Sequence, residues 1–125
     1  MIYLDTHVVA WLHALGADAL SPAAADAIET SRDIRISPMV RLELQYLFEL
    51  RRVTRPAVEV VDALQAALGL RVCDAPFAAV VREAEGEAWT RDPFDRLIVA
   101  QASLHGAELV SKDETLRAHY GATIW

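Results

Sequence analysis

Four carboxylates are placed where they could do chemistry, each at a point where an apolar segment meets a turn: Asp5, Glu43, Asp95 and Asp113. Asp5 closes the apolar opening 1–4, and Asp113 follows the apolar pair Leu109 and Val110. Acids at the carboxyl ends of buried parallel strands would lie in the crevice where α/β proteins bind ligands. Hard oxygen ligands of this kind suit Mg²⁺ or Mn²⁺. Such ions activate water and stabilise charge on a phosphate, so the pattern indicates phosphodiester hydrolysis.

Each acid also has a structural interpretation. Asp5 and Asp113 would cap the helices that follow them. Asp92, followed by proline, has the form of an N-cap, which puts Asp95 in the first turn, where a carboxylate interacts well with the helix dipole. Glu43 is harder to explain in this way, because it lies on the flank of its helix's apolar stripe rather than on the opposite face. Capping and metal binding both stay open for the aspartates, and Glu43 favours function.

Apolar periodicity and helix breakers divide the chain into alternating strands and helices. We expect strands at 2–5, 34–37, 70–73, 108–111 and 123–124. We expect helices at about 7–15, 22–31, 38–51, 56–68, 76–88 and 93–105, and a helical turn at 114–119. Three helix starts carry an N-cap followed by proline, at Ser21, Ser37 and Asp92. Strands that alternate with helices pair in parallel through right-handed crossovers, so the predicted fold class is α/β.

Length and composition predict one domain over residues 1–125 with a packed core, since 54% of the residues are hydrophobic and 24% charged. The net charge of −6 speaks against a general nucleic-acid binder, although charge can be local. Cys73 is the only cysteine, which excludes an intrachain disulfide and indicates a buried thiol. A strand that starts at Met1 leaves no room for a signal peptide, and no apolar run approaches the ~20 residues of a bilayer span. We therefore expect a cytoplasmic protein without membrane association.

Four segments together resemble the PIN-domain ribonucleases, especially the VapC-type toxins of prokaryotic type II toxin–antitoxin pairs. They are the opening Leu4-Asp5-Thr6-His7, the stretch from Ser37 to Glu43, the segment Asp92-Pro-Phe-Asp95-Arg, and Leu109-Val-Ser-Lys-Asp113. The resemblance covers nearly the whole chain. Its most specific part is the Asp-Pro-Phe-Asp-Arg segment followed by Asp113 eighteen residues after Asp95.

This resemblance implies a PIN-like three-layer α/β/α sandwich with a five-stranded parallel sheet. It implies a metal-dependent endoribonuclease that uses Mg²⁺ or Mn²⁺ and leaves 5′-phosphates. The implied catalytic and metal-binding acids are Asp5, Glu43, Asp95 and Asp113. Asp92 matches an accessory acid, and Thr6 and Ser111 match small hydroxyl positions beside the site.

The resemblance also implies partners: an RNA substrate, a second copy in a homodimer, and a cognate antitoxin. The C-terminal segment of such an antitoxin lies in a groove near the active site and can offer an arginine to the acids. Broad apolar faces on helices 38–51 and 56–68 are consistent with a partner, although ordinary core packing explains most of them.

Two arginines and a histidine beside the acids are candidates for contacting RNA: Arg91, Arg96 and His7. Each arginine would pair equally well with a neighbouring acid, and a histidine on a first helix is more often structural or exposed. The tryptophans have no spacing that predicts a stacking platform, so we assign them to the core or a dimer surface: Trp11, Trp89 and Trp125.

Three alternatives to a ribonuclease remain. A catalytically silent PIN-like interaction module would keep the fold without needing metal. A phosphoacceptor receiver domain also uses acids at strand ends, but it needs a paired acid near the first strand, where Asp5 stands alone, and the strand at 70–73 offers only Asp74. A structure-specific DNA nuclease would need an added clamp or arch segment, which so short a chain lacks.

Overall fold

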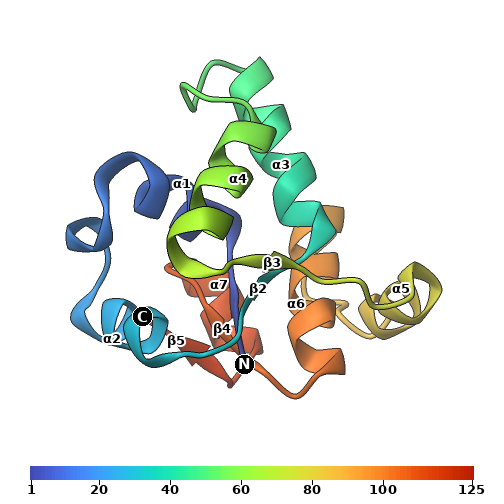
Figure 1. Cartoon of the computed structure of the whole chain (residues 1–125). Helices are drawn as coiled ribbons and strands as arrows, with labels where there is room; N and C mark the ends of the chain where they lie inside the picture. The colour runs from blue at the N-terminus through green and yellow to red at the C-terminus, as the bar shows by residue number, and fades with distance from the viewer.

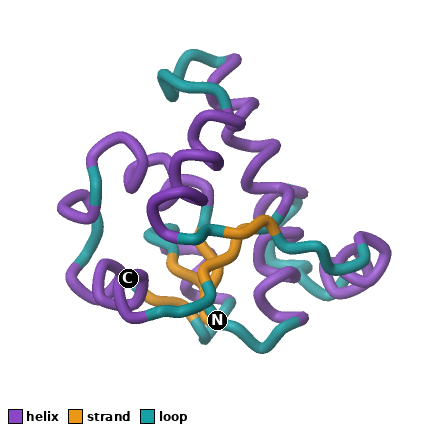
Figure 2. The backbone as a smooth tube through the Cα atoms, viewed as in Figure 1, coloured by secondary structure: helices purple, strands orange, loops and turns teal.

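Five short parallel strands form one sheet at the centre of the molecule (Figures 1 and 2). The computed structural model describes residues 1–125. The strands are β1 (Ile2–Leu4), β2 (Ile34–Ile36), β3 (Arg71–Val72), β4 (Glu108–Val110) and β5 (Thr123–Ile124). Their order across the sheet is β3-β2-β1-β4-β5, and every neighbouring pair is parallel.

Seven α-helices and one 3₁₀ turn surround this sheet. They are α1 (Thr6–Leu15), the 3₁₀ turn η1 (Ala17–Ala19), α2 (Pro22–Thr30), α3 (Pro38–Glu49), α4 (Ala57–Leu68), α5 (Phe77–Ala84), α6 (Pro93–Leu104) and α7 (Glu114–His119). In Figure 1, α2 lies to the left of the strands and α5 and α6 to the right, while α3 and α4 project together at the top. No helix combines the length and apolar character of a transmembrane span.

The direction of winding reverses once, and the reversal sets the position of the candidate site. From β1 the chain moves outward in one direction to β2 and then β3; after β3 it crosses back to β4 and continues to β5. Right-handed crossovers therefore put α1 to α4 on one face and α5 to α7 on the other, which gives the expected three-layer α/β/α arrangement. The reversal lies between β1 and β4. Open α/β sheets bind ligands at this kind of switch point, outside the carboxyl ends of the strands.

The core explains why the inner strands are mostly short apolar runs, whereas both residues of the edge strand β3 are exposed. All three residues of β1 are buried, and Leu4, Ile36 and Leu109 are fully inaccessible to solvent. Strands covered by helices on both faces need apolar side chains at successive positions rather than at alternate ones. Cys73 is buried in the same core, as predicted.

Helix boundaries agree with the predicted breakers except at α5. Proline follows an N-capping side chain at Ser21, Ser37 and Asp92, as predicted. We expected a helix over 76–88, but α5 ends at Ala84. Tight turns at 84–88, where the amide of Gly86 donates to the carbonyl oxygen of Glu83, replace the helical hydrogen bonds there. Gly86 also has a low intrinsic helix propensity, which favours the end of the helix here.

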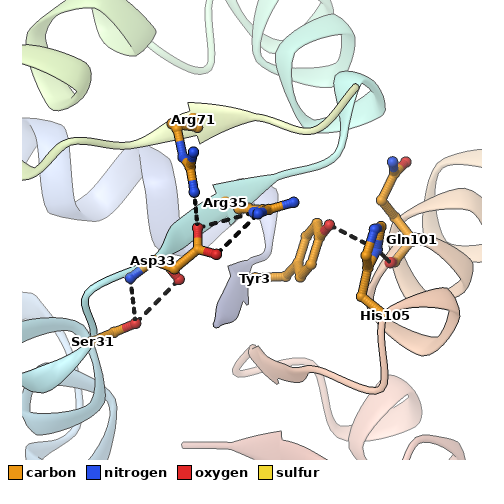
Figure 3. A network of polar contacts seen from close by, with 7 residues as sticks. All are labelled: Tyr3, Ser31, Asp33, Arg35, Arg71, Gln101 and His105. Carbon is orange, nitrogen blue, oxygen red and sulfur yellow. Dashed lines mark hydrogen bonds and ion pairs between the residues drawn. The ribbon is translucent and has the colours of Figure 1, made fainter. Parts of the chain in front are cut away.

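A polar network occupies the region of the sheet away from the candidate site (Figure 3). Asp33, directly before β2, accepts hydrogen bonds from Arg35 at 2.9 and 3.0 Å and from Arg71 at 2.6 Å. The hydrogen bonds from Arg35 contribute most, followed by that from Arg71, and together they lower the pKa of the Asp33 carboxyl to about 2. Nearby, the Tyr3 hydroxyl lies 3.1 Å from Nδ1 of His105. Two of the chain's arginines are thus engaged with an acid outside the site.

Candidate active site

Asp5 is held at the switch point by two hydrogen bonds. It follows β1 and is the N-cap of α1. Its Oδ1 accepts from the backbone amide of Thr6 at 2.7 Å, and its Oδ2 accepts from the Ser111 hydroxyl at 2.6 Å. Only 7% of the residue is exposed, and this burial raises the pKa of the Asp5 carboxyl, while the hydrogen bond from Ser111 opposes the increase. Asp5 is therefore both a cap and an oriented, buried acid.

Asp113 reaches the same place from β4. It is the N-cap of α7, where its Oδ1 accepts from the backbone amide of Leu116 at 2.7 Å. Its own amide donates to the Ser111 hydroxyl oxygen at 3.1 Å. Ser111 thus bridges the two acids that follow β1 and β4. The charge of Asp113 contributes to the raised pKa of Asp5, which indicates that the two carboxylates are close.

Asp95 lies in the first turn of α6, and its pKa is raised to about 7. Burial is the main cause, and the charges of the other four acids named from the sequence all add to it: Asp92, Asp5, Asp113 and Glu43. Asp92 is the exposed N-cap of α6 and accepts from the amide of Phe94 at 2.8 Å. The five acids therefore share one electrostatic environment, although they come from four parts of the chain.

Glu43 faces this environment from α3. It is half-buried, and burial followed by the charges of Asp5 and Asp92 raises its pKa. The neighbouring Thr6 hydroxyl opposes part of this increase but makes no hydrogen bond of good geometry: Thr6 Oγ1 is buried and has no partner. A buried hydroxyl without a partner beside two carboxylates is a group that a bound ion or water can satisfy.

No cationic side chain forms an ion pair with these acids. The three ion pairs of the molecule all lie elsewhere, on Asp33 and Glu59. Our alternative that Arg91 and Arg96 pair with neighbouring acids is wrong, because both donate to backbone carbonyls: Arg91 Nη1 to Ala88 at 2.8 Å and Arg96 Nε to Thr90 at 2.8 Å. The acid cluster therefore has no ion-paired counter-charge, although the charge of His7 offsets part of the increase that burial causes in the pKa of Asp5 and of Glu43.

The surface beside the acids has a hollow of about 190 Å³ lined by Asp5, His7, Trp11, Lys112 and Asp113. Next to it lies a more apolar groove of about 230 Å³, which His7 and Trp11 also line. Trp11 and Trp125, which no spacing in the sequence links, approach to 5.9 Å between ring centroids, and Trp89 and Trp125 pack against the core, as predicted. Lys112 was not among the residues predicted for the site. The one signal for it was its place as the chain's sole lysine, directly before Asp113.

The fit of a divalent cation to these residues can be judged from the donors. No group of three or more His, Cys, Asp or Glu side chains is already close enough to hold an ion by itself. Mg²⁺ commonly binds through one or two carboxylates and keeps several waters, so a loose set of acids suits it better than a closed cage. The raised pKa of Asp95 and the unpartnered Thr6 oxygen both fit a site that lacks positive charge. The residues are therefore compatible with a hydrated Mg²⁺ or Mn²⁺ ion.

The chain is similar to several known proteins. A model of the PIN domain matches residues 2–122. Ribonuclease VapC22 from Mycobacterium tuberculosis is 36% identical over 129 aligned positions, which cover 99% of this chain and 98% of that protein. Two solved structures share the fold. A toxin–antitoxin complex from Klebsiella pneumoniae has a TM-score of 0.67 at 15% identity, covering 100% of this chain and 97% of that one. VapBC2 from Rickettsia felis, bound to a promoter DNA fragment, has a TM-score of 0.64 at 18% identity and covers both chains fully.

Proposed function

The chain belongs to the PIN-domain family, with a VapC ribonuclease as a full-length relative, and from that membership we propose that it is a metal-dependent endoribonuclease. It hydrolyses RNA phosphodiester bonds in the cytoplasm and acts as the toxin of a toxin–antitoxin pair. The observation that carries the proposal is the raised pKa of Asp95, because its causes include the charge of every other acid predicted for the site. Burial is the largest cause, and a buried acid whose pKa is raised further by nearby acids, with no ion-pair partner, is typical of a functional site.

Four side chains would hold the ion in this proposal: Asp5, Glu43, Asp95 and Asp113. A bound Mg²⁺ or Mn²⁺ would activate water and stabilise negative charge on the phosphate, which leads to 5′-phosphate products. Ser111 keeps the Asp5 carboxylate in one orientation and links it to Asp113. Thr6 supplies the backbone amide to Asp5 and a free buried hydroxyl, and Asp92 adds charge beside Asp95.

Substrate contacts are assigned to three groups at the edge of the cluster. The guanidinium groups of Arg91 and Arg96 each use donors on backbone carbonyls and retain other N–H groups for phosphate oxygens. His7 is exposed and lines the hollow beside Asp5. These groups would offset the repulsion between an acidic site and an RNA backbone.

The apolar groove next to the acids is the proposed binding site for a cognate antitoxin. Its walls include Ala10, Ala14, Leu44 and Leu47, and Arg52 and Arg55 lie at its rim. Both solved neighbours above come from toxin–antitoxin assemblies, which supports this assignment. We also propose a homodimer, because α3, its C-cap residue and α4 expose large apolar side chains that the core does not use: Leu42, Tyr46, Leu50 and Val58.

One observation favours a second candidate, the catalytically silent interaction module. As the side chains lie, no three of the acids form a ready metal cage. A silent module would keep the fold and the groove while binding no divalent ion at the acids. Metal binding and cleavage therefore separate the two functions.

The test is to incubate the purified, antitoxin-free protein with total cellular RNA and Mg²⁺ or Mn²⁺, and again with a chelator, and to map new 5′ ends. We expect discrete, metal-dependent cuts that bear 5′-phosphates. Asp95→Asn should abolish them, whereas Asp62→Asn, a change to an exposed acid on α4, should not. Folded protein that cuts no RNA with either metal would overturn the enzyme and leave the interaction module.

A further inference from the structure

One wall of the acid-lined hollow is made of aromatic rings and the chain's only lysine. The ammonium of Lys112 lies 5.6 Å from the ring centre of Trp11 and 5.8 Å from that of Trp125. The two indoles are 5.9 Å apart and tilted by 57°. His7 continues the series, with its ring 5.8 Å from that of Trp11. Segments from α1, the end of β4 and the end of β5 therefore meet here.

Lys112 has an unusual partner for a lysine in an acidic neighbourhood. It precedes Asp113 in the sequence and lines the same hollow as Asp5, yet it forms no ion pair with either. Cation–π contacts with two tryptophans hold its ammonium group instead. A ring face does not accept a conventional hydrogen bond as a carboxylate does. The three N–H donors of the Lys112 ammonium therefore stay available for another acceptor. A phosphate oxygen is an acceptor of the right charge.

Trp11 and Trp125 differ in what supports them. Trp125 packs against the hydrophobic core, whereas Trp11 does not and is partly exposed between the hollow and the apolar groove. An aromatic ring that the core does not use, next to a positioned cation, is the arrangement with which proteins stack an unpaired base and hold its phosphate. Trp125 then serves as the support of the wall.

We propose that Lys112 and Trp11, flanked by His7, form a nucleotide subsite beside the acids. Lys112 contacts the phosphate of a nucleotide that flanks the cleaved bond, and its base stacks on Trp11. A base inside a duplex cannot leave its pair to reach the ring without losing stacking and pairing, so duplex RNA is disfavoured. This inference rests on the proposed function, because the acids supply the cleavage that the subsite directs.

The experiment compares matched variants in steady-state cleavage of a short single-stranded RNA. Lys112→Met and Trp11→Leu should each raise KM about tenfold and leave kcat within about twofold, as loss of one phosphate contact or one stacked base predicts. Lys112→Arg and Trp11→Phe keep the charge and the ring and should restore KM. Arg32→Met is the control for net charge. It removes an exposed cation that precedes β2, at the amino ends of the strands, whereas the acids lie at the carboxyl ends. The same RNA annealed to its complement should be cut at least tenfold more slowly.

A second measurement does not depend on cleavage. Fluorescence anisotropy with the Asp95→Asn protein and a labelled single-stranded RNA should show weaker binding when Lys112→Met or Trp11→Leu is added. Cleavage with KM unchanged in these variants, or duplex cut as fast as single strand, would overturn the subsite and leave the ribonuclease in place. Binding that depends on Lys112 and Trp11 without any cleavage would support the subsite and overturn the enzyme. Variants that lower only the melting temperature would show that the wall is a structural support, and absence of both binding and cleavage would overturn both.

Discussion

The hydroxyl of Ser111 donates a 2.6 Å hydrogen bond to Oδ2 of Asp5, although the two residues are 106 positions apart in the sequence. The same oxygen accepts a hydrogen bond from the Asp113 amide at 3.1 Å. One buried hydroxyl therefore sets the relative position of the acids that follow β1 and β4.

Ser111→Ala should weaken both folding and metal binding. The mutation removes a donor from a buried carboxylate, which costs about 1–3 kcal/mol, and it raises the pKa of Asp5 further because this hydrogen bond now lowers it. Thermal unfolding in chelator and Mn²⁺ titration measure the two effects. Ser103→Ala is the matched control, because its hydroxyl donates a 2.7 Å bond to Glu83 outside the site. An equal loss of Mn²⁺ affinity in both variants would contradict the proposed role of Ser111.

Asp95→Asn should stabilise the metal-free protein while it abolishes cleavage. A carboxyl with a folded pKa of about 7 holds its proton more tightly in the folded than in the unfolded state, so folding stability falls as pH rises from about 4 to 7. Removing that charge should raise the free energy of unfolding at pH 8 by roughly 1–2 kcal/mol, less than the full shift because the other acids relax. The difference should vanish below about pH 4. Denaturant unfolding in chelator across this pH range tests it, and a variant that fails to fold would favour a purely structural role for Asp95.

Glu43→Gln should remove most of the stabilisation that Mn²⁺ gives the protein. An ion that binds only the folded state at 100 times its Kd raises the free energy of unfolding by about 2.7 kcal/mol. The wild-type melting temperature should therefore rise with Mn²⁺, and that of Glu43→Gln should rise much less. Glu49→Gln, an exposed change near the end of the same helix, should behave as wild type. A full Mn²⁺ response in Glu43→Gln would exclude Glu43 from the metal site.

Asp33→Asn should lower stability at neutral pH by about 1 kcal/mol, a figure discounted for solvent screening of partly exposed groups. The folded pKa of about 2 lies below the unfolded value near 4, so the contribution is complete above pH 4 and is lost as pH falls to 2. Urea unfolding at pH 7 and at pH 2 measures the difference between variant and wild type. Asp26→Asn, an exposed change on α2, is the control and should show no such pH dependence.

The parts of the site that lie at strand ends were predictable from local pattern. Apolar runs before Asp5 and Asp113 indicated buried strands, and the stripe of α3 placed Glu43 on its flank. The capping and catalytic interpretations of Asp5 turned out to be compatible, because its two carboxylate oxygens accept from different donors. The local sequence pattern indicates that a residue follows a strand. The order of the strands in the sheet then decides which strand ends lie side by side.

The aromatic wall was not predictable by the same reasoning. Trp11 and Trp125 come from opposite ends of the chain, and no periodicity links them. Their approach depends on β5 lying at one edge of the sheet and on the packing of α1 beside it, which are properties of the whole fold. The early end of α5 was missed for a related reason, since turn hydrogen bonds around Gly86 compete with a helical pattern that is itself unbroken.

The reversal of winding between β1 and β4 has a consequence during synthesis of the protein. β1 is made first but gains its β4 neighbour only after more than a hundred further residues, so the Asp5 environment stays incomplete on the ribosome until Ser111 and Asp113 have emerged. Contacts this distant in sequence form late, after local helices. A nascent chain that has not yet reached Asp113 therefore lacks part of the proposed active site and should not cleave RNA.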